Sequence, residues 1–400
     1  MKKILCMSMI IPILFCTTGF GKRTEQINIV SSDTYPIIQK VKTPIEEYRV
    51  SMSFVGDIIF HKAVLESSKK GQEYDFKEIF THIKDDLNES DLIFGNLETT
   101  FAGDDKGISG TNFVFNTPDQ GARDLKWAGF DILNTSNNHS LDRKAYGLKR
   151  TNDILDKEEI YRIGTYNSIE ESNQAHVFDY NGIKIGFISY TYGTNGWPIP
   201  KDMPYSIKLI NNEKILADIE VLKKEKPDFI VASIHWGNEY KQVPNKYQKA
   251  LAELLNENNV DVIVGSHPHV MQPVTSILGE NGHETLIMYS MGNFISGQRK
   301  HPRDYGGIVQ LELIKKGDDK YYNNVWYTPT WVQSTWKDGR RYMRIVNLTK
   351  ALENYSNETD TFFSKYEVNR MKHILREIPK IVLTNDEYIK EDDRYLIYKK

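Results

Sequence analysis

The sequence predicts an α/β sandwich, in which mixed sheets carry helices on their outer faces and polar residues gather at strand ends. Short, β-branched apolar runs such as Val260–Val264 have the composition of buried strands, and segments between them such as Tyr247–Asn258 have helical periodicity. The apolar runs also end, one after another, in histidine, asparagine or carboxylate residues. Carboxyl ends of parallel strands are the place where α/β folds keep their functional sites.

Composition limits the classes of function. The 400 residues allow one large domain or two ordinary ones, and 40% hydrophobic with 26% charged residues is ordinary for a globular chain. The formal net charge of −3 provides no basic surface for nucleic acid, so no nucleic-acid partner is expected. No G-x-x-x-x-G-K-[ST] motif occurs, which leaves a P-loop ATPase role without support.

The N-terminus predicts export. Lys2 and Lys3 precede an uncharged, largely apolar run from Ile4 to Phe20, so residues 1–21 are expected to be a signal peptide or a membrane anchor. Residues 22–400 are then placed at the extracellular face of the cell membrane. Both cysteines lie within the leader, which excludes disulfides and thiolate ligands from the exported part. Any metal there must be held by His, Asp, Glu or Asn side chains.

In the first half of the chain, three predicted strands end in polar clusters. A polar tether at 22–47 leads to a strand at 48–55, which is followed by Gly56-Asp57. An amphipathic helix is expected over 74–89, and the next strand, 91–94, runs into Gly95-Asn96-Leu97-Glu98. The third strand, 131–135, leads to Asn137-Asn138-His139 and Asp142.

The second half repeats this pattern. Asn181-Gly182 between two β-runs predicts a hairpin over 175–190. A helix at 215–226 precedes a strand at 228–234 that ends in His235, and a helix at 247–258 precedes the strand that ends in Gly265-Ser-His267-Pro-His269. Further strands are expected at 285–290, 306–314 and within 320–350, followed by a helix within 358–382 and a charged tail.

Each cluster has an ordinary explanation, because Asp, Asn and His also form turns and helix caps. The recurrence of polar clusters at five or six strand ends favours a shared metal site instead. The candidate ligands are Asp57, Asn96, Glu98, Asn138, His235, His267 and His269. Oxygen and imidazole ligands without thiolate suit Mn, Zn or Fe. The set is large enough for one divalent ion or for two about 3.5–4 Å apart, an arrangement suited to displacement at phosphorus.

Taken together and in order, these motifs resemble the CapA/PgsA capsule-synthesis proteins, over roughly residues 48–300. They comprise Gly-Asp57, Gly-Asn96-Leu-Glu98, Asn137-Asn138-His139-Ser-Leu-Asp142, His235-Trp-Gly, Gly-Ser-His267-Pro-His269 and Gly-Asn293-Phe. That family consists of membrane-anchored, extracellular proteins of poly-γ-glutamate capsule production, with a core similar to calcineurin-like metallophosphoesterases. The resemblance therefore implies a four-layer α-β-β-α sandwich of two mixed sheets with helices outside.

The resemblance also implies roles for single residues. Asp57 matches the first metal-binding aspartate of the metallophosphoesterases, and Asn96 or Glu98 matches their bridging-carboxylate motif. The later metal ligands of that pattern are matched by His235, His267 and His269. The implied catalytic residues are His139 as general acid, Asn138 and Asp142. Two positions depart from the phosphoesterase pattern. First, the phosphoesterases have a histidine two residues after the first aspartate, whereas here the nearest histidine, His61, comes four residues after Asp57. Second, Asn96 stands where those proteins have an aspartate that bridges two metals.

The sequence thus predicts a CapA-like protein of capsule biosynthesis or export, with a hydrolase related to metallophosphoesterases as the leading hypothesis. Its substrate would be an anionic polymer or a phosphoester, and its partners the membrane and membrane capsule synthase subunits. Two alternatives stay open: a non-catalytic scaffold that binds polymer or synthase, and an unrelated extracellular phosphodiesterase. The expected division is leader 1–21, tether 22–47, a phosphoesterase-like domain 48–317, and C-terminal strands and helix at 318–400 that extend the same domain.

Overall fold

The computed structural model describes residues 26–30, 37–41, 45–111, 114–383 and 389–399, in two compact units. In the unit Met1–Glu46, β1 (Gln26–Val30) pairs antiparallel with β2 (Ile37–Val41), within the segment predicted as a tether. The predicted leader lies outside the described residues. Within the described part of the chain, no helix has the length and apolarity that crossing a membrane requires.

The unit Glu47–Lys400 contains two mixed sheets. The larger, ten-stranded sheet has the order β19-β20-β17-β16-β3-β6-β7-β8, with β15 beside β3 and β18 beside β17. Its strands are β3 (Glu47–Ile58), β6 (Leu92–Leu97), β7 (Ile132–Asn134), β8 (Tyr161–Ile163), β15 (Asn293–Ile295), β16 (Tyr305–Lys316), β17 (Asp319–Lys337), β18 (Arg340–Asn347), β19 (Ile389–Glu391) and β20 (Arg394–Tyr398).

The smaller sheet has six strands in the order β13-β14-β12-β11-β10-β9. They are β9 (His176–Tyr180), β10 (Ile183–Thr191), β11 (Phe229–His235), β12 (Val262–Ser266), β13 (Val274–Leu278) and β14 (Glu284–Met288). Strands β3, β6, β7 and β8 of the larger sheet run parallel, as do β10, β11, β12 and β14 of the smaller one. Parallel neighbours bring their carboxyl ends to one edge of each sheet.

The described helices of this unit are α1 (Lys62–Ser68), α2 (Lys77–Phe80), α3 (Lys84–Leu87), α4 (Gln120–Ala128), α5 (Lys144–Lys157), α6 (Ile169–Asn173), α7 (Asn212–Lys224), α8 (Lys246–Glu257), α9 (Leu348–Ser356) and α10 (Lys365–Val382). A short 3₁₀ turn, η1 (Asp104–Lys106), and a small hairpin of β4 (Lys69–Lys70) and β5 (Glu73–Tyr74) complete the elements.

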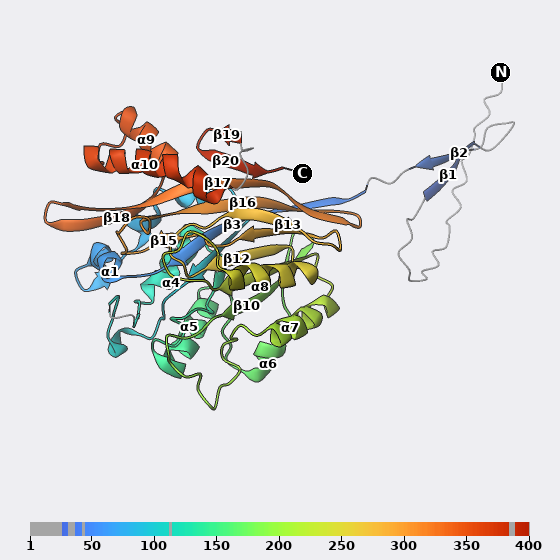
Figure 1. Ribbon diagram of the computed structural model, residues 1–400, viewed down its shortest axis with the longest axis horizontal. Coiled ribbons are helices and arrows are strands. Elements are labelled where there is room, and N and C mark those ends of the chain that lie inside the picture. The colour runs from blue at the N-terminus through green and yellow to red at the C-terminus, as the bar shows by residue number, and fades with distance from the viewer. Residues whose placement is uncertain (1–25, 31–36, 42–44, 112–113, 384–388, 400) are drawn as a thin grey trace, which may run out of the picture. The chain divides into compact units, whose positions relative to one another are not determined.

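Alternating side chains sort into layers. On β3, Met52 and Phe54 face the core between the two sheets, where they join Phe187 of β10 and Val231 of β11. The opposite face of the larger sheet packs against α1–α5, and the opposite face of the smaller sheet packs against α7 and α8. In Figure 1, α9 and α10 lie over the β17–β18 part of the larger sheet. The predicted fold class, a four-layer sandwich of two mixed sheets with helices outside, is confirmed.

Two predicted segments differ in detail. The single helix expected over 74–89 is two short helices, α2 and α3, although its apolar stripe of Phe76, Phe80 and Leu87 is buried as expected. The backbone leaves the helix at Ile83, whose φ is −123°, and the preceding residue, His82, accepts a hydrogen bond from Arg344 of β18 at 3.1 Å. The charged tail forms the β19–β20 hairpin, and β20 pairs with β17.

Candidate metal centre

The candidate ligands meet where the carboxyl ends of both sheets adjoin. Asp57 lies near the end of β3, Asn96 lies in β6, and His235 is the last residue of β11. Two buried contacts join the sheet edges: His235 Nε2 lies 2.9 Å from Asn138 Oδ1, and Ser189 Oγ donates to Asn134 Oδ1 at 2.5 Å. The structure thus brings the polar residues of five strand ends, those of β3, β6, β7, β11 and β12, to one place, as the repeated sequence pattern predicts.

Two carboxylates form the floor of the site. Asp57 and Glu98 are fully buried, and the amide of Asn96 donates to both, at 2.8 Å to Asp57 Oδ1 and 3.2 Å to Glu98 Oε2. Asn96 Oδ1 in turn accepts from Asn134 at 2.8 Å and from Asn137 at 3.3 Å. Both ends of the Asn96 amide are therefore engaged. The sequence predicts Asn96 as a metal ligand. The geometry fits a different role better, in which Asn96 positions the two carboxylates.

Three buried histidines stand around these carboxylates. His269 Nδ1 lies 3.0 Å from Asp57 Oδ2, and its Nε2 lies 3.7 Å from Glu98 Oε1. The rings of His235 and His267 are 4.9 Å apart, and His235 Nδ1 contacts Ser266 Oγ at 2.8 Å. Burial, reinforced by neighbouring histidines, lowers the pKa of His267 to about 4 and that of His235 well below its usual range. Both imidazoles are thereby kept neutral, the form that binds metal.

The backbone of the segment Gly265–His269 is unusual. His267 has φ of 100° and His269 has φ of 57°, in the region that residues other than glycine rarely adopt. Gly265 is required by close packing, because a Cβ there would lie 2.1 Å from the carbonyl oxygen of Tyr289. Such strain persists only where the surrounding structure enforces it, and it clusters at functional sites.

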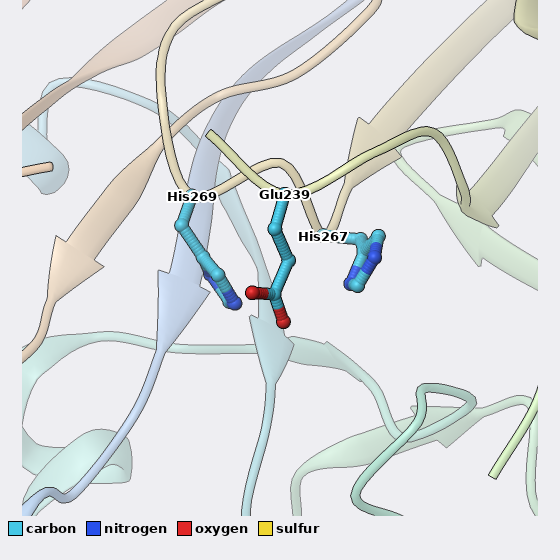
Figure 2. Close-up of side chains that lie close together, drawn as sticks. All are labelled: Glu239, His267 and His269. Carbon is cyan, nitrogen blue, oxygen red and sulfur yellow. The ribbon is translucent and has the colours of Figure 1, made fainter. Parts of the chain in front are cut away.

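Glu239 completes the cluster and was not foreseen from the sequence. Glu239, His267 and His269 each place one ligand atom within 4.8 Å of the others, as do Asp57, Glu98 and His235. Figure 2 shows the Glu239 carboxylate between the two imidazoles. Glu239 stands four residues after His235, in the loop after β11. A search of strand-end loops beyond the first two residues would have found it.

Two buried atoms test whether the site suits a cation. Glu98 Oε1 and His267 Nδ1 are both buried, and neither has a hydrogen-bond partner among the described residues. Buried polar atoms are almost always paired, so such exceptions need an explanation. A divalent cation would satisfy a carboxylate oxygen and a neutral imidazole nitrogen together. The residues present therefore fit a metal ion.

His139 borders the cluster as one half of a dyad. Its Nδ1 lies 2.8 Å from Asp142 Oδ2, which also accepts from the Phe115 amide at 2.6 Å. Burial raises the pKa of Asp142, and its contact with His139 opposes that rise. The dyad holds a proton on Nδ1 and directs Nε2 toward Glu98 Oε1, 3.9 Å away. Asn138 is anchored beside it, donating to Asn195 Oδ1 at 3.0 Å.

A model of the bacterial capsule synthesis protein family PGA_cap matches residues 51–298, which is more than half of the chain and includes all the candidate ligands above. The chain belongs to this family. It is 27% identical over 348 residues to the capsule biosynthesis protein CapA of Bacillus anthracis, covering 84% of this chain and 81% of that protein. It is 30% identical over 291 residues to the PGA biosynthesis protein CapA of Bacillus subtilis, covering 70% of this chain and 72% of that one.

Solved structures show more distant similarity. A phosphatase from Mycoplasma pneumoniae shares 17% identity at a TM-score of 0.42, covering 71% of this chain and 94% of that one. The NAD nucleotidase of Haemophilus influenzae shares 14% identity at a TM-score of 0.45, covering 84% of this chain and 61% of that one.

This PGA_cap chain lacks the histidine that phosphoesterases carry two residues after the first aspartate, and the structure shows what replaces it. Position 59 is a buried isoleucine, and His61 belongs to neither of the two ligand groups at this site. His61 Nδ1 instead accepts from the Gly297 amide at 3.2 Å. Burial lowers the pKa of His61 to about 3. His61 is thus a neutral wall of the site, and His269 is the imidazole that contacts Asp57.

A further group of possible ligands in this family member, His301, His373 and Glu377, is better described as an ion-pair network. Arg370 donates to His301 Nδ1 at 2.8 Å, and arginine cannot accept. His301 therefore holds its proton on Nε2, which faces Glu377 Oε2 at 3.4 Å. A protonated nitrogen is not a metal ligand.

Proposed function

We propose that this PGA_cap protein is an exported, membrane-associated hydrolase that depends on divalent metal and acts in capsule biosynthesis or export. The convergence of Asp57, Glu98 and Glu239 with the histidines His235, His267 and His269 supports it most directly. Buried ionisable groups without partners are costly, and they concentrate at functional sites. The substrate class is an anionic polymer or a phosphoester.

Two groups of residues would hold the metal: Asp57, Glu98 and His235 in one, Glu239, His267 and His269 in the other. Divalent metals in such sites activate water and stabilise charge on an oxygen that is being displaced. The protein's own contribution is proton transfer and orientation. His139 Nε2 faces the cluster and would protonate the leaving group, Asp142 fixes its ring and tautomer, and Asn138 aligns the neighbouring loop.

Export is part of this proposal. Its support is the basic start and the uncharged run of residues 4–20, which has the pattern of a leader. The name of the Bacillus anthracis relative, a capsule biosynthesis protein, agrees with a role at the cell surface. At that surface the membrane and membrane synthase subunits would be the partners.

A scaffold that binds polymer or synthase without catalysis is the second candidate. Two observations favour it: Asn96 occupies the position of a bridging carboxylate, and Ile59 that of a ligand histidine. The intact His139–Asp142 dyad favours the hydrolase instead, because binding alone gives no reason for an oriented proton donor.

Metal content separates the candidates. The full chain would be purified with detergent, dialysed against Mn²⁺ or Zn²⁺, and analysed for bound metal and for hydrolysis of phosphodiesters and capsule polymer. We expect His267→Ala to lose metal, hydrolysis and rescue of capsule-deficient cells. His176→Ala, on the edge strand β9, is the matched control and should retain all three. If His267→Ala still restores polymer and metal leaves the melting temperature unchanged, the hydrolase proposal fails in favour of the scaffold.

A further inference from the structure

A pocket adjoins the candidate metal centre and shares a wall with it. Its volume is about 390 Å³, within the roughly 300–1,000 Å³ that is usual for small-molecule sites. Residues 236–238, which join His235 to Glu239, line the pocket. Tyr192 lines it as well, and its ring centre lies 4.5 Å from that of His267 and 6.0 Å from that of His235. A ligand in the pocket would therefore lie next to the metal ligands.

The lining of the pocket combines aromatic rings with carboxamides. Among the described residues, those that line it include no charged side chain. Its aromatic members are Trp236, Tyr192 and Tyr247, and the two tyrosines are 47% and 73% exposed, so their rings are open to a ligand. Asn212 and Asn238 line it with exposed amides. The metal centre holds three carboxylates, whereas this neighbouring pocket suits an uncharged group.

Two helices begin beside the pocket, α7 and α8, and both are already capped. Asn245 Oδ1 accepts from the backbone amides of Tyr247 and Gln248, at 2.9 and 3.0 Å. Asn211 Oδ1 accepts from the backbone amide of Lys214 at 3.0 Å. Free amides at a helix N-terminus attract anions, but these amides have their partners within the chain. The helix ends therefore also favour an uncharged occupant.

The loop after β10 connects this pocket with the proposed general acid. Tyr192 is the first residue after β10, and its ring forms part of the pocket wall. Asn195 stands three residues further on, and its Nδ2 lies 3.4 Å from His139 Nε2. One short loop thus contacts both the pocket and the nitrogen that would protonate a departing oxygen.

We propose that the pocket binds an uncharged sugar ring whose oxygen is esterified to a phosphate at the metal centre. The inference rests on the proposed function, because it selects a sugar phosphoester as the substrate of that site. Tyrosine and tryptophan offer large apolar faces, against which the carbon-bound hydrogens of a pyranose ring pack. The hydroxyls of the sugar donate and accept hydrogen bonds, and so do carboxamides. A row of carboxylates would lose its hydration in this pocket without gaining a cation from its lining.

Hydrolysis would separate the sugar from the phosphate. The oxygen of water would bond to phosphorus, and the bond between phosphorus and the sugar oxygen would break. His139 would donate its proton to the departing sugar oxygen, and the proton released by water would restore His139. The products would be a free sugar hydroxyl and phosphate, with no oxidant or reductant involved.

Binding of defined probes tests the sugar site. A β-1,4-linked N-acetylglucosamine disaccharide, adenosine and a γ-linked glutamate oligomer would each be titrated against the full chain, in a detergent without a sugar headgroup. N-acetylglucosamine 1-phosphate would be titrated with and without Mn²⁺. The test variants are Tyr247→Ala and Asn238→Ala. The matched control is Tyr146→Ala, because Tyr146 is also exposed beside a lysine: Lys106 Nζ lies 5.3 Å from its ring centre, and Lys246 Nζ lies 5.1 Å from that of Tyr247.

We expect Tyr247→Ala to bind the disaccharide about tenfold more weakly and Asn238→Ala about threefold more weakly, with the control unchanged. Mn²⁺ should tighten binding of the sugar phosphate to wild type and leave that of the disaccharide unchanged. Equal disaccharide affinity in wild type and Tyr247→Ala overturns the sugar site, and so does tighter binding of adenosine or glutamate oligomer. Tyr247-dependent disaccharide binding without any effect of Mn²⁺ on the sugar phosphate would uphold the sugar pocket and refute the metal-dependent hydrolase, so the two failures are distinguishable.

Discussion

Replacing Glu98 by Gln should have opposite consequences with and without metal. Glu98 is fully buried, and its Oε1 faces His269 Nε2 at 3.7 Å and His139 Nε2 at 3.9 Å. Burial, together with the charges of Asp57 and Glu239, raises the pKa of Glu98. An acid with a raised folded pKa costs stability as pH rises above the unfolded value of 4.5. Without metal, Glu98→Gln should therefore unfold at the same temperature as wild type or higher.

With metal the order should reverse. A bound ion at about a hundredfold excess over its dissociation constant stabilises wild type by about 2.7 kcal/mol. With an unfolding entropy of about 2.1 cal/mol/K per residue for the unit Glu47–Lys400, this stabilisation corresponds to a rise of about 4 °C in melting temperature. Glu98→Gln should lose most of that gain because it removes a charged ligand.

Differential scanning fluorimetry near neutral pH, with and without Mn²⁺ or Zn²⁺, measures both effects. The control is Glu367→Gln, also a buried carboxylate, which loses charge-assisted hydrogen bonds worth about 1.5–3 kcal/mol whether or not metal is present. Its metal-dependent gain should match wild type. An equal gain in Glu98→Gln and wild type would refute Glu98 as a ligand.

Three further changes test other parts of the site. His139→Ala should lower turnover by about 10²–10⁴-fold, the usual contribution of a general acid, while dialysis experiments still find most of the metal bound. Asp142→Asn should also lower turnover and shift the pH–rate profile, because a neutral amide no longer stabilises a positive charge on the His139 ring from which Nε2 donates. His61→Gln should weaken the acid sensitivity of the metal-free protein in urea titrations. The pKa of His61 is about 3 in the folded protein and 6.5 in the unfolded chain. The wild-type protein therefore loses stability as pH falls below 6.5, by about 2 kcal/mol at about pH 5.

The fold was largely predictable because its strands are buried and bounded by helices or turns. Phe229–His235 and Val262–Ser266 are short apolar runs, and each ends where the sequence changes to polar residues. The failures lie where tertiary contacts override local pattern. The 74–89 stripe is apolar at helical spacing, yet the backbone leaves the helix at Ile83, next to the contact of His82 with Arg344 of β18. The β19–β20 hairpin exists through its pairing with β17, which no local signal in a charged tail reveals.

The site was predictable to the extent that its residues directly follow strands. His235, His267 and Asp57 are adjacent to apolar runs, and parallel pairing brings such positions together. Glu239 escaped notice because the β11 loop returns to the cluster only after four residues, through the bond from Tyr240 N to the carbonyl of Pro268 at 2.7 Å. The role of Asn96 was equally hidden, since only the three-dimensional network shows that both ends of its amide are engaged.

The departures from the phosphoesterase pattern alter the charge of the site without removing its capacity for metal. Asn96 removes one expected negative charge, and three carboxylates remain among the two ligand groups: Asp57, Glu98 and Glu239. One divalent cation would leave the cluster negative, whereas two would make it positive. His269 favours the second case, because it contacts Asp57 of one group while it belongs to the other. A positive centre would attract a polyanion to a chain whose formal net charge is −3. The attraction would then depend on metal, so polymer binding and metal loading should rise together.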